Sequence, residues 1–534
     1  MRARSARRLI TSSGAILLLA LSIVALTDDV ARPQAGEIGP AHTVTDDAPT
    51  RRSPRSIEAD VPQPPAVATP LLPAGDFGAY EAAKETANAT AGGSRNGAPE
   101  PAGAPPLVKP KLKGVNRRGV QSSQTDSIVP DPHGAVGSKH FVEVVNRRIL
   151  VIKKAKPKVE TADVSLASFF DYGAEPLVHP QVVYDHRAKR WIITAAAFPE
   201  SATVQRLFLA VSAGDNPNGE FDIYNFDVDV DDNGNYLDRP MLGFNKRAIV
   251  MTGNIFDAPP PGTTTYLETN VLVLPKQDAY AGDPVSLDML PVGATGSMAP
   301  PIVLDDRNEV FLLQSHTSGD EITVWRGAGF GLATPSVSSL HDVPVASYSV
   351  PPDAEQPGTD QLLDTGDARF LNASTQYGDR LWNVHTISQL NIATPRFYEI
   401  DLTLGVPDQA GGFWASNSSA DFNASLAANK RGEVFVTWTS TDAAAGIDAE
   451  VRFSGRRPTD TANEIRRPGT VLTGSLTSFD TTAAPVEPWG ASSAVSLDPV
   501  KSGDCKKQRR AWIVNQTIKS PAAWSTRIGR IGYC

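Results

Sequence analysis

The sequence is short of positive charge. Its 50 lysine and arginine residues are outnumbered by 59 aspartate and glutamate residues, which gives a net charge of −9 at pH 7. Nucleic acids and anionic membrane surfaces both attract basic proteins, so this balance argues against either as a partner. We expect no nucleic-acid binding and no membrane association by charge.

Long apolar runs are also scarce, and one of them lies at the N-terminus. Four arginines among the first eight residues precede the run Ala15–Leu26. A basic segment followed by about 12 apolar residues is typical of a secretory signal peptide, whereas a spanning helix needs about 20. We therefore expect residues 1–31 to be a signal peptide or an N-terminal anchor, and the chain to be secreted or held in the cell envelope.

Cysteine is the third scarce feature. The two cysteines are Cys505 and the C-terminal Cys534, and neither lies near other residues at zinc-ligand spacing. In an exported chain an even pair indicates a disulfide, which across a loop of about 30 residues would stabilise the fold by ~3 kcal/mol. We predict a Cys505–Cys534 disulfide, with two free thiols as the alternative.

Residues 32–112 are rich in proline, alanine and glycine, as in PQPPAVATPLLPAG and AGGSRNGAPEPAGAPP. Such a composition buries too little apolar surface to offset the entropy of ordering the chain. We predict a disordered linker, which would tether the rest of the chain to the N-terminus.

One pattern recurs seven times in the remainder: a small or polar residue, an alternating apolar run, a turn and a second apolar run. Its copies begin at Pro130, His179, Asp238, Ala299, Ala368, Phe422 and Trp489. A spacing of about 50–70 residues is typical of propeller blades rather than helical repeats. We predict an all-β fold, a seven-bladed β-propeller formed by residues 113–534.

The two ends of this repeat indicate how the predicted propeller closes. The first copy begins with an inner strand, and the last stops after its third strand, STRIGRIG. The last blade therefore lacks an outer strand, and an open edge there would favour aggregation. We predict that Lys113–Ser123 fills this place beside Thr526–Gly532.

Several segments resemble a group of secreted bacterial β-propeller proteins with a sialidase-like architecture. They are DPHGAVGSKHFVEVVN, the H-P-x-V-x-Y-D-x4-R-W stretch at His179–Trp191, LAVSAGDNPNGEFDIYNF and LDRPMLGF. The closing segment WGASSAVSLDP…WSTRIGRIGYC is similar to the terminal blade of that group, including its paired cysteines. The resemblance spans about Asp131–Cys534 and implies the fold, but no assigned activity.

The chain departs from that group at two blade starts. It has His179-Pro180 where relatives usually carry G-D-P, and W-G-A-S-S from Trp489 where they carry W-G-D-Y-S. Asp238 is retained. These departures put in doubt a ring of inner-strand carboxylates around the central funnel.

The loop Asp229–Asn235 is the clearest candidate metal site. Asp229, Asp231, Asn233 and a glycine match positions 1, 3, 5 and 6 of a calcium loop, but Pro240 stands where the bidentate glutamate belongs. Asp238 lies close enough to substitute for that ligand. We predict Ca²⁺ or another hard cation on Asp229, Asp231, Asn233 and Asp238, with a solvated acidic loop as the alternative.

Three blade-start residues, Asp131, His179 and Asp238, are candidates for a central-funnel site. The inner-strand position of His179 should face the channel, and both aspartates begin other blades. Together they would form a small polar or metal site. The alternative is a single channel histidine held by a neighbouring carbonyl.

Motifs of several enzyme classes are absent: G-x-S-x-G, H-E-x-x-H, a phosphate loop and the S-x-D-x-G-x-x-W boxes of sialidase propellers. We therefore assign no catalytic residue. We expect a non-catalytic exported module whose surface loops bind a polymer, a glycan or a protein. The alternative is an extracellular carbohydrate-active hydrolase or lyase that uses funnel residues, for which hydrolysis requires paired carboxylates about 5–10 Å apart.

Overall fold

The computed structural model describes residues 42–57, 60, 72–95, 108–201, 203–258, 264–294, 296–481, 484–500 and 509–534. The predicted signal peptide or anchor, residues 1–31, lies outside these ranges. In the described part of the chain, no helix combines the length and the apolar character needed to cross a membrane.

Most of the described chain forms antiparallel units of four strands. In chain order their strands are β4 (His133–Val136), β5 (His140–Val145), β6 (Arg148–Lys153), β7 (Glu160–Ser165); β8 (Leu177–Asp185), β9 (Arg190–Ala197), β10 (Arg206–Ser212), β11 (Phe221–Asp227); β12 (Tyr236–Phe244), β13 (Ala248–Phe256), β14 (Tyr266–Pro275), β15 (Val285–Pro291); β16 (Met298–Ala299), β18 (Val310–Gln314), β19 (Gly319–Ala328), β20 (Ser336–Tyr348); β22 (Ser374–Tyr377), β23 (Arg380–Gln389), β24 (Ile392–Asp401), β25 (Val406–Gly412); β26 (Ala420–Ala428), β27 (Val434–Asp442), β28 (Ile447–Arg456), β29 (Thr470–Gly474); and β31 (Ala494–Leu497), β32 (Arg510–Ser520), β33 (Ala523–Gly532) with β3 (Lys111–Gln121).

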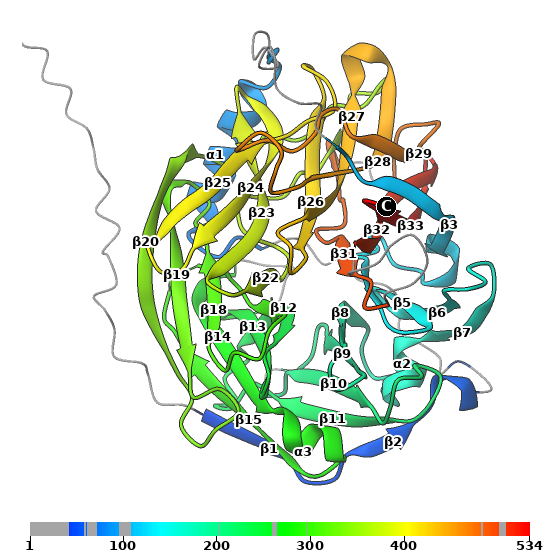
Figure 1. Cartoon of the computed structure of the whole chain (residues 1–534), viewed down its shortest axis with the longest axis vertical. Coiled ribbons are helices and arrows are strands. Elements are labelled where there is room, and N and C mark those ends of the chain that lie inside the picture. The colour runs from blue at the N-terminus through cyan, green and yellow to red at the C-terminus, as the bar shows by residue number, and fades with distance from the viewer. Residues whose placement is uncertain are drawn as a thin grey trace, which may run out of the picture. The chain divides into compact units, whose positions relative to one another are not determined.

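A few short elements connect or flank these units. They are β17 (Pro301–Val303), β21 (Leu362–Leu363), β30 (Val486–Glu487), α2 (Leu166–Phe170), α3 (Lys276–Ala281), η2 (Ser122–Gln124) and η3 (Ala443–Ala445). Strand β17 pairs in parallel with β12 and β22 and so joins two units into one sheet, and β21 pairs with β30. The fold is therefore all-β, and Figure 1 shows the sheets following one another around a common axis, as in a β-propeller.

The second strand of each unit is apolar because neighbouring sheets cover both of its faces. Every residue of β27 is buried, and in β9 all but the first are. Contact between sheets is close at Trp191 of β9, where a Cβ on Gly137 would lie 2.4 Å from the indole ring. Only glycine leaves room for the ring at that position.

The predicted closing strand is confirmed. β3 pairs antiparallel with β33, for example Asn116 with Gly529 and Arg117 with Ile528. Figure 1 shows β3, from the early part of the described chain, beside the C-terminal strands β32 and β33. The edge that the last repeat leaves open is thereby covered.

The described part of residues 32–112 differs from the predicted disordered linker. β1 (His42–Asp46) pairs with β15, and β2 (Thr50–Arg52) pairs with β11. They are followed by the turn η1 (Pro54–Ser56) and by α1 (Phe77–Ala89). Composition did not reveal these pairings because the partner strands lie more than a hundred residues away.

The segment 72–95, which we call the N-terminal arm, is fixed to the strand body by buried cations. Lys84 Nζ lies 2.7 Å from an Asp353 carboxylate oxygen and donates to the carbonyls of Pro351 and Gly366. Arg95 donates to four acceptors, among them the Ser419 carbonyl at 2.9 Å. Such contacts make the arm part of the folded structure.

Candidate functional site

A β-bulge recurs in the first strand of three units and changes the direction of one side chain in each. The register of β8 shifts between Val178 and Gln181, that of β12 between Asp238 and Met241, and that of β26 between Phe422 and Ser425. A bulge of this kind redirects a side chain and is common beside functional sites. The redirected residues are His179, Arg239 and Asn423, whose φ angles are +49°, +45° and +49°.

Asp131, just before β4, has the same left-handed backbone, with φ +41°. Non-glycine residues rarely adopt this conformation, and Asp131, His179 and Arg239 each also precede a proline, which restricts them further. Strain of this kind persists where surrounding contacts hold it, and it concentrates at functional sites. Here Asn146 supplies such contacts, since it accepts the His179 N–H at 2.9 Å and donates to Asp131 at 3.0 Å.

The structure brings the three predicted funnel residues together. His179 Nε2 lies 3.8 Å from Asp131 Oδ2, and His179 Nδ1 lies 3.8 Å from Asp238 Oδ1. Arg239 Nη1 lies 3.5 Å from Asp131 Oδ1. The exposed fractions of Asp131, His179 and Asp238 are 2%, 3% and 1%, so one imidazole stands between two buried carboxyl groups.

The predicted alternative, a histidine held by a carbonyl, does not match this geometry. Neither ring nitrogen of His179 has a hydrogen-bond partner among the described residues, and the same holds for Asp238 Oδ2. Buried polar atoms are seldom left without a partner in folded proteins. Of these residues, His179 lines a cavity and is therefore available to a ligand or to water.

The two carboxyl groups have opposite electrostatic environments. Burial alone would raise the pKa of Asp131, but Arg239, His179 and donated hydrogen bonds outweigh it, so that pKa lies below its ordinary value. Burial raises the pKa of Asp238 to about 6, against the opposing effect of Arg239 and Arg369. Burial, assisted by Arg239, lowers the pKa of His179 to about 3. Near neutral pH, His179 is therefore uncharged beside an ionised Asp131.

Arg369 is held rigidly at the same site. Its Nε donates to Asp367 at 2.5 Å, one Nη donates to Ser297 at 2.9 Å, and the other donates to the Leu72 carbonyl at 2.7 Å. Because Leu72 belongs to the N-terminal arm, the arm takes part in positioning a guanidinium of the site.

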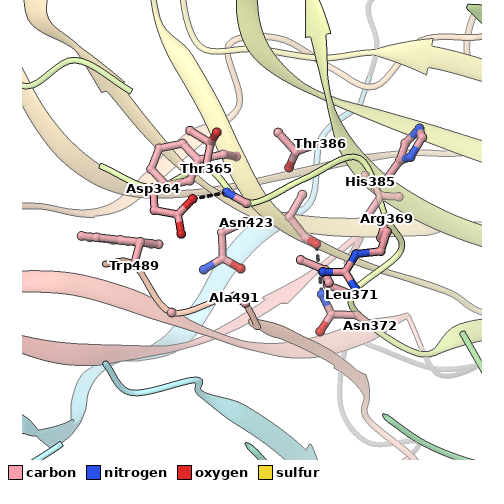
Figure 2. A pocket seen from close by; sticks show the side chains of 15 residues that line it. Asp364, Thr365, Arg369, Leu371, Asn372, His385, Thr386, Asn423, Trp489 and Ala491 are labelled. Atoms are coloured by element: carbon pink, nitrogen blue, oxygen red, sulfur yellow. Dashed lines mark hydrogen bonds between the residues drawn. The ribbon is translucent and has the colours of Figure 1, made fainter. Parts of the chain in front are cut away.

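Two adjoining cavities share Arg369, Leu371 and Ala491 in their walls. The first is lined by Asp131, His179 and Arg239. The second is shown in Figure 2. A third cavity lies against later residues of the inner strands and is mainly apolar. Polar groups are thus concentrated where the bulged residues lie.

Asp238 differs from the position that we predicted for it. Asp131 and His179 each directly precede a proline, and the residue in that place on β12 is Arg239. Arg239 lines the first cavity, whereas Asp238 lies behind His179 and accepts from the Tyr236 hydroxyl at 3.4 Å. The proline that follows each of the three cavity residues is a sequence signal that points to Arg239 rather than Asp238. The contribution of Arg369 had no comparable signal in the sequence.

The predicted calcium ligands do not converge in the structure. The Asp229 carboxylate accepts the backbone N–H groups of Asn233 and Gly234, while the side chains of Asp231 and Asn233 are exposed and Asp238 is buried in the site above. Among the described residues, no group of three or more histidine, cysteine, aspartate or glutamate side chains is placed to hold a metal ion. Calcium binding by this loop stays a prediction, with the solvated acidic loop as its alternative.

The structure does not test the predicted disulfide, because Cys505 lies outside the described residues. The Cys505–Cys534 pairing also stays a prediction.

No protein-family model and no curated protein matches the sequence. Solved structures do resemble the fold. The polysaccharide lyase Uly1 is 8% identical, with a TM-score of 0.36 over 62% of this chain and 78% of the lyase. The Penicillium chrysogenum α-L-arabinanase complexed with arabinobiose is 8% identical, with a TM-score of 0.34 over 80% of this chain and 99% of the arabinanase.

The Trypanosoma rangeli sialidase is 9% identical, with a TM-score of 0.33, and this chain spans about half of its length, 54%. All three similar structures are carbohydrate-active enzymes. These findings contradict the prediction of a non-catalytic binding module, which is therefore not kept. At these identities the likeness concerns the fold, so the chemistry has to come from the residues of this chain.

Proposed function

We propose that this protein is a carbohydrate-active hydrolase whose reaction is carried by Asp131, His179 and Asp238. The observation that supports it is the placement of two buried carboxyl groups on opposite nitrogens of one imidazole, which lines a cavity together with Asp131 and Arg239. Glycoside hydrolysis requires one carboxyl group that stays ionised and one that keeps its proton. Environments that shift two carboxyl pKa values in opposite directions assign these roles.

Asp131 is the ionised group and faces the cavity. It would stabilise positive charge that develops on the sugar ring, or activate the attacking water. Asp238 keeps its proton up to about pH 6 and lies against His179 Nδ1. Asp238 would transfer its proton to His179 Nδ1, while His179 Nε2–H donates its own proton to the leaving oxygen. The imidazole would thereby relay one proton from Asp238 to the cavity. Catalytic hydrogen bonds commonly shorten when substrate binds.

A screen for reducing-end release from neutral and acidic polysaccharides tests the proposal. We expect Asp131→Asn, His179→Gln and Asp238→Asn each to lower kcat/KM at least ~100-fold, the usual effect of removing an acid–base group. Asp232→Asn, on an exposed loop residue, is the matched control and should keep full activity. Folding is checked from the melting temperature.

Two outcomes would reject this assignment. One is a correctly folded Asp131→Asn variant with wild-type activity. The other is an ultraviolet-absorbing unsaturated product, which would identify a lyase instead.

We propose in addition that the four-stranded units are the seven blades of a propeller and that the protein is exported. The repeat count and the N-terminal basic and apolar segments support these points. Electron-microscopy class averages viewed along the common axis would count the blades, and N-terminal sequencing of protein recovered outside the cytoplasm would locate any cleavage.

A further inference from the structure

We propose that the second cavity, lined by Asn372, Asn423 and Trp489, is a separate sugar-binding subsite and that the substrate is a neutral oligosaccharide. This inference rests on the proposed function, since it places one sugar unit beside Asp131 and the next in the second cavity. The sugar chain would pass Arg369 and Ala491, which line both cavities.

Three buried polar groups of this cavity lack partners. Asn372 Oδ1, Asn423 Oδ1 and Trp489 Nε1 have no hydrogen-bond partner among the described residues, and the three residues are 6%, 8% and 5% exposed. Figure 2 shows all three side chains around the same cavity. Two acceptors and one donor at fixed positions match the hydroxyl groups of a sugar, each of which both donates and accepts.

These groups are held in place by their surroundings. Asn372 Nδ2 donates to the Ala424 carbonyl at 3.2 Å, and Asn423 Nδ2 donates to Asn515 Oδ1 at 3.3 Å. Trp489 packs edge-on against Phe422, with ring centroids 6.0 Å apart. Asn423 is also redirected by the same bulge that aims His179 and Arg239, so one backbone feature supplies both cavities.

Both arginines that line the two cavities are already paired, which is why the substrate should be neutral. Arg239 has Asp131 at 3.5 Å and Arg369 has Asp367 at 2.5 Å. Asp364 shares Lys84, at 3.9 Å, with the closer Asp353. A uronate or sialic acid carboxylate would have to compete with a carboxylate of the protein for either arginine. Burying a charge without a partner is costly, so such sugars are disfavoured.

Titration calorimetry in the Asp238→Asn background at pH 5 tests the inference. This change should slow turnover at least ~100-fold, and it replaces a carboxyl group that is protonated at that pH. The neutral probes are arabinotriose and β-1,3-galactotriose, and the acidic probe is trigalacturonate. We expect a neutral probe to bind and trigalacturonate to bind at least ~10-fold more weakly, or not at all.

Two further substitutions locate the subsite. Trp489→Phe keeps the aromatic ring and removes the donor, and Asn423→Gly removes the side chain while tolerating a positive φ. Each should weaken binding of the neutral probe about tenfold, the effect of one lost hydrogen bond. The matched controls are Trp524→Phe and Asn463→Gly, in which a buried tryptophan and another asparagine with positive φ, at +62°, are changed away from either cavity. They should leave the affinity unchanged.

The inference is overturned if no neutral probe binds, if Trp489→Phe and Asn423→Gly bind like the controls, or if trigalacturonate binds more tightly. Failure of the proposed function is a different result. If the neutral probe binds in a way that depends on Trp489, the subsite is supported. If the wild-type protein at the same time cleaves no saccharide, the proposed hydrolase is rejected.

Discussion

We predict that Glu143 makes the stability of the fold depend on pH. This residue of β5 is fully buried, and its carboxylate accepts the Val120 N–H at 3.1 Å and the Thr526 hydroxyl. A Cβ on Gly119 would lie 2.3 Å from a Glu143 oxygen, so the glycine leaves room for the carboxyl group. One side chain thus connects β5 with β3 and β33, which lie at the two ends of the repeat.

Burial raises the pKa of Glu143 to about 7 from an ordinary value of 4.5. Below pH 4.5 the group is protonated in both the folded and the unfolded chain, and its full stabilising effect is present. Between pH 4.5 and 7 the unfolded chain loses the proton first, so the free energy of unfolding falls. A shift of about 2.5 units corresponds to about 3 kcal/mol, and above pH 7 the loss is complete.

Urea denaturation of the wild type and of Glu143→Gln at pH 4.5 and pH 8 measures this effect. The glutamine variant should lose about 3 kcal/mol less than the wild type between the two pH values. Glu160→Gln, a change of an exposed carboxylate, should follow the wild type. Equal pH dependence in the wild type and Glu143→Gln would refute the reasoning.

Two other results are expected. In the proposed hydrolase, kcat/KM should fall about tenfold per pH unit above pH 6, because Asp238, whose pKa is about 6, must hold a proton; a pH–rate profile that stays flat to pH 8 contradicts this role. Lys84→Met leaves Asp353 buried without its cation and should lower the free energy of unfolding in urea by about 3 kcal/mol. Lys113→Met, a change outside the arm, is the control for that measurement, and equal stability of the two variants would show that the arm adds nothing.

The fold was predictable because its signals are local. Alternating apolar residues and turn residues recur within each unit, so the sequence alone predicted successive β-sheets and the pairing of β3 with β33. The same repeats led to Asp131 and His179, since each stands at a blade start. In this part of the chain, local pattern and tertiary structure agree.

The site was only partly predictable. Arg239, rather than Asp238, lines the first cavity because the bulge in β12 displaces the register by one residue, and one residue of register decides which way a side chain points. Asn423 and Trp489 come from units far apart in the sequence. The folded chain brings them together in one cavity, and no local sequence pattern predicts that.

The N-terminal arm shows the same division between sequence and tertiary structure. Its composition predicted a disordered linker, because it has few apolar residues with which to form a core of its own. Acceptors for Lys84 and Arg95 that lie more than 250 residues away in the sequence hold the arm in place. The sequence by itself therefore determined the repeated sheets and two of the site residues, because these follow from periodicity and turns. Only the tertiary structure decided which residues the bulges redirect, which charges pair and where the N-terminal arm binds. Each of these depends on partners that the folded chain brings within a few ångströms.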